Sequence, residues 1–230
     1  KENALSRNRS VLENNANVDV ELWNKIVELG WTGIRIPEEY SGLGLGHLEL
    51  CVIAEELGRF LAPVPFSSSV YLFTEAIINY ANDDIKKEIL PKLVSGEVIG
   101  TLAVAEDLQA PTADNISLQS DNNILNGKKI AVPDAEIATH AIVVAKTSSG
   151  ISLQLVDLNA DGVKIEKQEN IDESRGYFSI LFENSPSKLI GDETGGWDLY
   201  EALMNQAAVL FGYEQIGGSQ AALDLSLIHI

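Results

Sequence analysis

Apolar residues recur at every third or fourth position through much of residues 20–93, which is the spacing of helices with one buried face. The segment 20–29 is the clearest example, because Asp19 precedes it as an N-cap and Gly30 follows its last apolar residue. Further helices are predicted over 47–58, 69–80 and 83–93. We therefore predict a helical domain that covers residues 1–97.

From residue 100 the pattern changes to short runs rich in β-branched and aromatic residues, separated by turn signals. In the stretch 124–145, Asn126-Gly127 lies between two apolar runs, and both residue types tolerate positive φ, so we predict a tight hairpin turn there. Strands are predicted over 101–105, 116–120, 128–132, 141–146, 151–156, 163–166 and 177–182. Their close spacing favours an antiparallel β-barrel over residues 98–190, with a sandwich as the alternative.

After Gly195-Gly196 the helical period returns and continues over 197–225, with Gly217 and Gly218 permitting close helix packing. We assign residues 191–230 to the first helix of a C-terminal helical domain. The predicted fold class is therefore α+β, with a helical domain, a β domain and the start of a second helical bundle.

Charge and composition narrow the range of partners. The formal net charge of −18 argues against nucleic acid and anionic membranes, since both would be repelled. No apolar run approaches the roughly 18 residues that a membrane span needs. The single cysteine, Cys51, forms no internal disulfide, so we expect a reducing, cytoplasmic location. One Cys and three scattered His make no metal-ligand cluster, so no metal site is expected.

Several short motifs occur in a fixed order along the chain. They are LGWTGI at 29–34, PEEYSGLG at 37–44, EELG at 55–58, LPKL at 90–93, NGKK at 126–129 and EQIGGSQAALD at 214–224. In this order they resemble the acyl-CoA dehydrogenase family. The glycines at 42–46 also suggest a dinucleotide fingerprint, but no strand precedes them, so a structural turn is the better interpretation.

The resemblance implies an N-terminal helical domain, a middle β-barrel and a C-terminal bundle, with FAD between barrel and bundle. It implies α,β-dehydrogenation of an acyl-CoA, in which a carboxylate removes the α-proton and the β-hydrogen leaves as hydride to FAD. It further implies electron-transfer flavoprotein as the partner that takes the electrons, and a homo- or hetero-oligomer, dimeric or tetrameric.

The resemblance places the flavin contacts on two segments. They comprise Val104, Ala105, Glu106, Ala131, Val132 and Pro133. Three of these depart from the family's usual residues: Ala105 lacks a hydroxyl, Ala131 lacks an aromatic ring, and Pro133 lacks both a hydroxyl and a backbone N–H. Each lost hydrogen bond weakens binding by about 0.5–1.5 kcal/mol.

The same resemblance places Phe66 and Ser68 in the acyl and thioester region. It assigns no catalytic residue within the chain, because the usual base lies beyond Ile230 and the alternative position holds Ala207. Glu201 and Glu214 are interpreted as part of a solvated helix face. We therefore expect the chain to be an N-terminal fragment that is inactive by itself.

The pair Lys128-Lys129 is interpreted as a solvated hairpin face, with a contact to a CoA phosphate as the alternative. Three functions stay open. The first is an FAD-dependent acyl-CoA dehydrogenase, and the second is a non-catalytic, flavin-poor partner subunit of a heteromeric dehydrogenase. The third is another use of the fold, such as a flavin monooxygenase or a nitroalkane oxidase.

Overall fold

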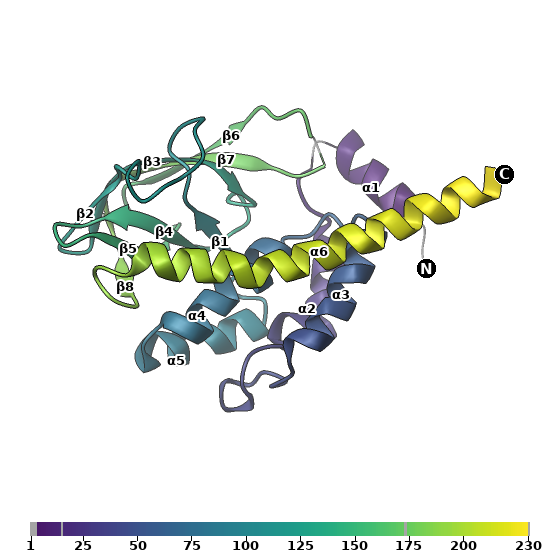
Figure 1. Ribbon diagram of the computed structural model, residues 1–230, viewed down its shortest axis with the longest axis horizontal. Helices are drawn as coiled ribbons and strands as arrows, with labels where there is room; N and C mark the ends of the chain where they lie inside the picture. Colours follow the sequence, from purple (N-terminus) through teal and green to yellow (C-terminus); the bar gives the residue numbers. More distant parts are fainter. Residues whose placement is uncertain (1–3, 15, 173, 230) are drawn as a thin grey trace.

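The computed structural model describes residues 4–14, 16–172 and 174–229 (Figure 1). The chain begins with α1 (Ala4–Glu13), α2 (Val20–Glu28), η1 (Trp31–Gly33), η2 (Glu38–Tyr40), α3 (His47–Arg59), η3 (Ser67–Thr74), α4 (Glu75–Tyr80) and α5 (Asp83–Val94). The strands follow as β1 (Gly100–Ala103), β2 (Gln119–Asp121), β3 (Ile124–Pro133), β4 (His140–Lys146), β5 (Ile151–Asp157), β6 (Val163–Gln168), β7 (Tyr177–Pro186) and β8 (Lys188–Ile190), and α6 (Gly196–His229) comes last. The predicted order of helices, sheet and terminal helix is confirmed. Residues 1–3, 15, 173 and 230, which the predicted domains include, lie outside the described residues.

Side-chain caps define two of the helix starts. Asp19 accepts a hydrogen bond from the backbone N–H of Leu22 at 2.9 Å, as its predicted N-cap role requires. Asn82 accepts one from Ile85 at 2.9 Å at the start of α5. These caps satisfy backbone donors that have no partner inside the helix, so local sequence alone determines where both helices begin.

The segment predicted as one helix over 69–80 consists of two forms. η3 is a fully buried π-helix, and α4 continues it as an α-helix. The wider π turn allows the hydroxyl of Thr74 to donate to the carbonyl of Ser69, five residues earlier, at 2.8 Å. Short π segments often mark functional sites, and η3 lies beside the candidate site described below.

The strands form one mixed sheet in the order β6-β7-β3-β2-β4-β5-β8, with β1 alongside β4. β1 and β2 run parallel to β4, whereas every other pairing is antiparallel. The sheet is therefore less purely antiparallel than predicted. β8 and the extension of β7 beyond residue 182 were not predicted, and β2 begins three residues later than predicted, at Gln119.

The predicted hairpin turn at Asn126-Gly127 is wrong. β3 continues through both residues, and the turn lies at Asn122-Asn123, where both φ values are positive, 48° and 61°. At Leu125/Asn126 the register against β7 shifts, and Asn126 Oδ1 accepts a hydrogen bond from the backbone of Asn184 at 2.8 Å. Gly127 has φ of 140°, and a Cβ there would lie 3.0 Å from Leu118, so glycine serves a bulge here rather than a turn.

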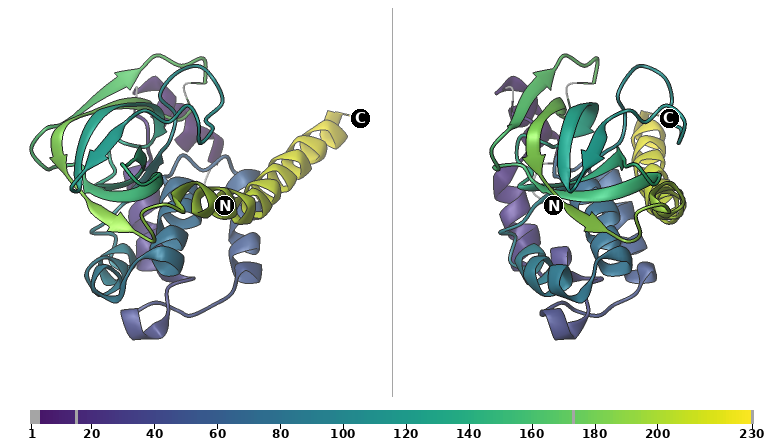
Figure 2. Two further views of the ribbon diagram at one scale, coloured as in Figure 1. Left: turned by 60° about the vertical axis from the view of Figure 1, so that its left-hand side comes forward. Right: turned by 90° about the vertical axis from the view of Figure 1, so that its left-hand side faces the viewer.

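The sheet carries a hydrophobic core on each face, because successive side chains of a strand point to opposite sides. On one face Ile142 and Val144 of β4 pack in a cluster that includes Leu210 of α6. On the other face Val143 packs with Phe178. α6 thus lies between the sheet and the N-terminal helices, and its C-terminal end projects beyond both (Figures 1 and 2).

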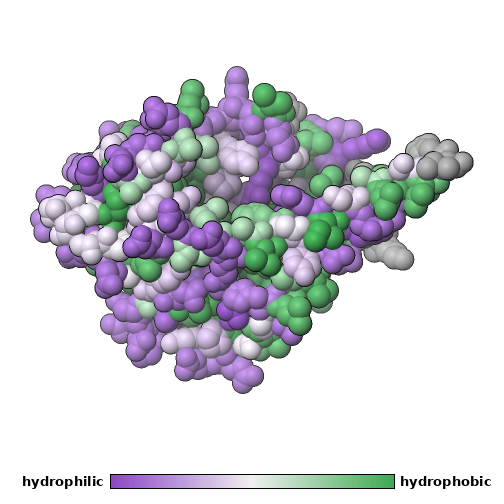
Figure 3. Space-filling model, in the orientation of Figure 1, coloured by the Kyte–Doolittle hydropathy of each residue, from purple (hydrophilic) through white to green (hydrophobic). Residues whose placement is uncertain are grey.

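Apolar side chains are exposed along the projecting end of α6 (Figure 3), where Leu223, Leu225 and Leu227 are exposed. Across the described ranges, no helix combines the length and the apolar character that crossing a membrane would need.

Candidate functional site

The two segments predicted to contact flavin lie side by side. The backbone N–H of Ile130 donates to the carbonyl of Ala105 at 2.8 Å, which joins the end of β1 to β3. Val104 is buried in the cluster between the sheet and α6. Lys129 Nζ also donates a hydrogen bond to the Val104 carbonyl, 25 positions earlier in the sequence. The structure therefore brings the two segments together.

Glu106 of the first segment forms an ion pair with the fully buried Lys129 of β3. Lys129 Nζ lies 2.7 Å from Glu106 Oε1 and is fully buried, whereas its neighbour Lys128 is exposed. Glu106 also accepts hydrogen bonds from the backbone of Ser117 at 2.9 Å and of Leu118 at 3.0 Å. The interpretation of Lys129 as a solvated hairpin residue is wrong, because its side chain lies on the buried side of β3.

The environment changes the pKa of both partners. Burial lowers the pKa of Lys129 to about 8, against the opposing effect of Glu106. Burial acts to raise the pKa of Glu106, but Lys129 and the donors from residues 117 and 118 together hold it below its ordinary value. The carboxylate of Glu106 is therefore committed to the interior of the sheet domain.

The second segment also uses most of its polar groups within the chain. Ala131 is exposed with φ of 51°, and its backbone N–H donates to Gln168 at 2.8 Å. Val132 is buried in the sheet core, and the carbonyl of Pro133 accepts a hydrogen bond from Thr101 at 2.6 Å. The backbone N–H of Ala131 and the carbonyl of Pro133 are therefore already paired within the chain.

Free main-chain donors remain at the end of β1. Within the described residues, the backbone N–H groups of Ala105 and Glu106 have no acceptor, although both residues are half-buried. A backbone donor at such a place bonds to water or to a ligand. The chain can therefore hold the polar edge of a flavin ring through these two N–H groups, without a side-chain hydroxyl at Ala105.

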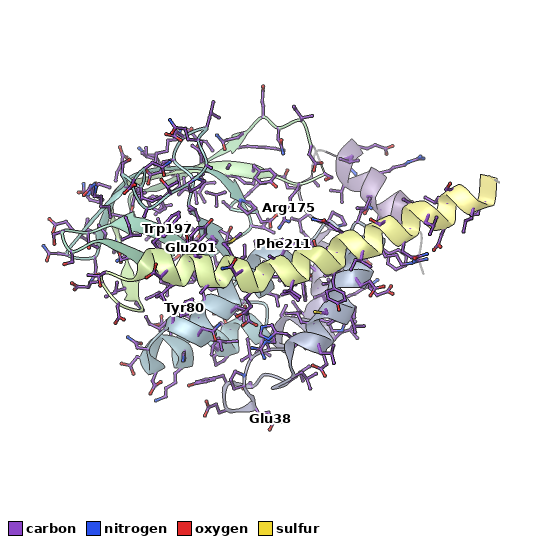
Figure 4. The ribbon with its side chains drawn as sticks, in the orientation of Figure 1. Glu38, Tyr80, Arg175, Trp197, Glu201 and Phe211 are labelled. Carbon is purple, nitrogen blue, oxygen red and sulfur yellow. The ribbon has the colours of Figure 1, made fainter. Side chains whose placement is uncertain are left out.

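A cavity of about 750 Å³ opens between α3, η3, the loop before β7 and the middle of α6 (Figure 3). Phe66 and Phe211 form apolar walls, and Arg175, Asp134 and Glu214 bring charge to it. Figure 4 labels Phe211 of α6 and Arg175 of the loop before β7. A volume of this size is typical of small-molecule sites.

The two predicted substrate residues differ in their relation to the cavity. Phe66 lines the cavity directly. Ser68 is buried outside its lining, where its hydroxyl donates to Asp134 at 2.5 Å. Asp134 in turn pairs with Arg175, with Oδ2 and Nη2 2.6 Å apart. Ser68 therefore supports the Asp134–Arg175 ion pair at one wall of the cavity.

Close packing of α3 against α6 positions Glu214 at the cavity. A Cβ on Gly58 would lie 2.0 Å from the carbonyl oxygen of Glu214, and a Cβ on Gly217 would lie 1.9 Å from that of Glu55. The two backbones touch because neither glycine has a side chain. Glu214 is therefore brought against the end of α3, where its side chain lines the cavity.

Glu214 differs from the other helix glutamate considered in the sequence. Glu201 is exposed and accepts a hydrogen bond from Trp197 at 2.8 Å, as expected for a solvated face (Figure 4). Glu214 is half-buried, and burial raises its pKa above the ordinary value of 4.5. The solvated interpretation of Glu214 is thus wrong. The nearby Gly217-Gly218 pair was the sequence signal for close packing at this position.

The buried Tyr71 lies next to Glu214. Its ring makes edge-to-face contacts with Phe66 and Phe211, with centroids 5.6 and 5.8 Å apart. Its hydroxyl is buried, and the nearby Glu214 carboxylate is the group that interacts with it. Burial, followed by the nearby charge of Glu214, raises the pKa of Tyr71 well above its ordinary value, so the hydroxyl remains a proton donor. Ala207, by contrast, is buried in the core and carries no functional group.

The helix contact yields a matched pair of substitutions on α6. Gly217→Ala is expected to destabilise the protein by about 1–3 kcal/mol, because the added methyl group meets the backbone of α3. Gly212→Ala is expected to stabilise it by up to about 1 kcal/mol, since no atom lies within 4 Å of the added methyl and alanine favours a helix. Thermal unfolding of both variants measures the difference, and equal shifts would contradict the close contact.

The helical layer, the mixed sheet and the long terminal helix together make the acyl-CoA dehydrogenase fold. Butyryl-CoA dehydrogenase from Megasphaera elsdenii superposes with a TM-score of 0.86 at 21% sequence identity, covering 95% of this chain and 63% of that one. Glutaryl-CoA dehydrogenase from Mycobacterium smegmatis, solved in complex with FADH2, superposes with a TM-score of 0.82 at 20% identity, covering 98% of this chain and 64% of that one.

Sequence comparison agrees with the fold. Residues 2–97 match the family described as acyl-CoA dehydrogenase, N-terminal domain. Mitochondrial isovaleryl-CoA dehydrogenase from Pongo abelii is 30% identical over 229 residues, which cover 91% of this chain and 54% of that relative. The chain is thus similar to acyl-CoA dehydrogenases along nearly its whole length. It spans about half the length of the curated relatives it matches.

Proposed function

We propose that the protein is an FAD-dependent acyl-CoA dehydrogenase that oxidises the Cα–Cβ bond of an acyl-CoA thioester. The observation that carries the proposal is the match with isovaleryl-CoA dehydrogenase along 91% of the chain. The cavity between α3 and α6 supports it, because its apolar walls and ionisable groups suit an acyl chain with a reacting centre.

FAD, when bound, supplies the acceptor for the β-hydrogen as hydride. We assign its ring edge to the backbone N–H groups of Ala105 and Glu106, beside the exposed Ala131. Val104 and Val132 support this edge from the core, and the carbonyl of Pro133 is held by Thr101. Phe66 contacts the acyl chain, while Ser68 acts through Asp134.

The proposal includes the partners that the family resemblance implies. Electron-transfer flavoprotein takes the electrons from the reduced cofactor, and the protein assembles as a dimer or tetramer. The negative charge of −18 keeps it away from nucleic acid and anionic lipid surfaces.

A flavin assay tests the proposal. We expect the whole protein to purify with the visible absorbance of oxidised flavin, and that absorbance to bleach when an acyl-CoA is added without oxygen. The panel includes isovaleryl-CoA and 2-methylacyl-CoA, which are named by the activities of relatives, together with longer saturated esters. A flavin-loaded protein that no acyl-CoA bleaches contradicts dehydrogenation and favours another chemistry on the same fold, such as a monooxygenase or a nitroalkane oxidase.

A specific observation favours a second candidate, a flavin-poor partner subunit of a heteromeric dehydrogenase. Ala105, Ala131 and Pro133 offer no side-chain hydrogen bond to a flavin, and their neighbours are committed inside the sheet. In that case the protein alone is colourless and acquires flavin only when co-purified with a second subunit. A stable flavin-loaded homo-oligomer contradicts this candidate.

A further inference from the structure

We propose that Lys129 is a positioning residue for the flavin, because it holds residues 104–106, the flavin-edge segment, so that the backbone N–H groups of Ala105 and Glu106 face the ring. The inference rests on the proposed function. It gives a fully buried side chain a role in cofactor binding, exerted through the backbone of a neighbouring segment.

The flavin-edge segment has its acceptors engaged and its donors open. The carbonyl of Val104 accepts a hydrogen bond from Lys129 Nζ at 2.8 Å, and the carbonyl of Ala105 accepts one from the backbone N–H of Ile130 at 2.8 Å. The Glu106 carboxylate accepts one from Lys129 Nζ at 2.7 Å. Within the described ranges, the backbone N–H groups of Ala105 and Glu106 have no acceptor. Successive backbone N–H groups bind electron-rich groups, such as the carbonyl oxygens of a flavin ring.

A bulge in β3 joins this strand to the flavin-edge segment. Ile130 and Ala131 of β3 oppose the single Ser179 of β7, and the register shifts there. The backbone N–H groups of both bulge residues bond outside β7, that of Ile130 to the Ala105 carbonyl and that of Ala131 to the side chain of Gln168. The lysine that precedes the bulge adds the second link between β3 and the end of β1.

The carboxylate of Glu106 also closes the base of the loop 107–116. It accepts hydrogen bonds from the backbone N–H groups of Ser117 at 2.9 Å and of Leu118 at 3.0 Å, and from the hydroxyl of Ser117. Lys129 thus connects β3 with the end of β1 and, through Glu106, with both ends of this loop. Without its ammonium group, Glu106 is held only from the loop side, and the flavin-edge segment loses its anchor to β3.

Lys129 also compensates charge at this edge. A carboxylate without its cation repels the oxygen-rich edge of a flavin ring, and Glu106 becomes such a carboxylate when Lys129 is neutral. Burial lowers the pKa of Lys129 to about 8, against the opposing effect of Glu106. Across the described part of the chain, Glu106 is the charged group that acts on Lys129, while Lys128 beside it is exposed. FAD binding is therefore expected to weaken as pH rises above about 8.

The test titrates FAD into the whole apo-protein and follows the change in flavin fluorescence. Lys129→Met should bind FAD about tenfold more weakly than the wild type at neutral pH, a loss equivalent to about one hydrogen bond. Lys128→Met removes a lysine from the exposed neighbouring position and should bind FAD as the wild type does. Glu75→Ala breaks a buried ion pair in the helical layer and should also leave FAD affinity unchanged, although it destabilises the fold.

Ser117→Ala provides a milder variant in case Lys129→Met folds poorly. Ser117 is exposed, and its replacement removes one donor to Glu106 without leaving a buried charge unpaired. We expect FAD affinity to fall by about threefold, with thermal unfolding close to that of the wild type. An unchanged affinity in Ser117→Ala would contradict the anchoring role of Glu106.

The pH profile of FAD affinity separates positioning from a structural role. The affinity of the wild type should fall between about pH 7 and pH 9.5 and approach that of Lys129→Met, because the lysine loses its proton in this range. Lys129→Met should lack this fall. A merely structural loss would lower the affinity of the variant by the same factor at every pH, so parallel profiles would overturn the inference.

Hydrogen exchange in the apo-protein measures the anchor without FAD. The amide of Ile130, which bonds to the Ala105 carbonyl, should exchange about tenfold faster in Lys129→Met than in the wild type. In Lys128→Met its exchange should be unchanged, and an unchanged rate in Lys129→Met overturns the inference even where FAD affinity falls.

The FAD titration distinguishes this inference from the proposed function. If the wild type binds FAD and Lys129→Met binds it equally well, the inference is overturned and the proposed function stands. The same holds if Glu75→Ala loses as much affinity as Lys129→Met. A wild-type protein that binds no FAD contradicts the proposed function and, with it, the role of Lys129.

Discussion

Replacing Glu75 with alanine is expected to lower the free energy of unfolding by about 3–5 kcal/mol, the cost of breaking a buried ion pair. Glu75 is fully buried at the start of α4, where Oε1 lies 2.8 Å from Arg35 and 3.4 Å from His47. Its second oxygen accepts a hydrogen bond from Gln206 of α6 at 2.7 Å. The substitution leaves the guanidinium of Arg35 without its carboxylate and removes a link between the N-terminal helices and α6.

Glu88 provides the control for Glu75, because it is a glutamate in a short ion pair at the surface. Glu88 lies 2.7 Å from Lys188, yet both side chains are about half exposed. Exposed pairs contribute about 0–1 kcal/mol, so Glu88→Ala should change stability little. Denaturant unfolding of both variants makes the comparison, and similar losses would show that burial does not set the strength of these contacts.

Replacing Lys129 with methionine is expected to destabilise the protein by about 3 kcal/mol near neutral pH, since Glu106 is then left buried without its cation. Methionine retains most of the apolar volume of the lysine stem, so the loss reports the charge and not a cavity. Lys128→Met, at the exposed neighbouring position, should lie within about 0.5 kcal/mol of the wild type. A loss in Lys128→Met as large as in Lys129→Met would contradict the buried pair.

The same residue predicts a characteristic pH dependence. The pKa of Lys129 is lowered from 10.5 to about 8 in the folded protein. Between these values the unfolded chain binds a proton that the folded chain does not, so this group makes the free energy of unfolding rise as pH increases from about 8 to about 10.5. Lys129→Met should lack that rise. Denaturant unfolding at a series of pH values measures it, and identical slopes in the two proteins would contradict the lowered pKa.

Local sequence predicted much of the secondary structure because the signals for it are themselves local. The cap at Asp19 and the apolar spacing of 20–29 predicted α2 to within one residue. The β-branched run within 141–146 predicted a strand, and β4 covers His140–Lys146. In each case the information lies within a few residues of the element that it determines.

The errors have a common physical origin in contacts between distant segments. Asn126-Gly127 has the composition of a turn, but pairing of β3 with β7, whose partners are 44 to 62 positions apart, converts it into a bulge inside a strand. Lys129 follows the exposed Lys128 in the sequence. Only the folded sheet shows that the side chain of Lys129 lies on the buried face and that of Lys128 on the exposed face. Neither the bulge at Asn126-Gly127 nor the burial of Lys129 can be inferred from the neighbouring residues in the sequence.

The sequence by itself determined the order of elements, most of the helices and strands, and the similarity to acyl-CoA dehydrogenases. Only the tertiary structure decided which polar residues are available for chemistry. Glu106 is paired with Lys129 and Asp134 with Arg175, whereas Glu214 lines the cavity next to Tyr71. Availability depends on what the fold places against each side chain, and for Glu214 that is set by the contact of α3 with α6, which are more than 100 residues apart in the chain.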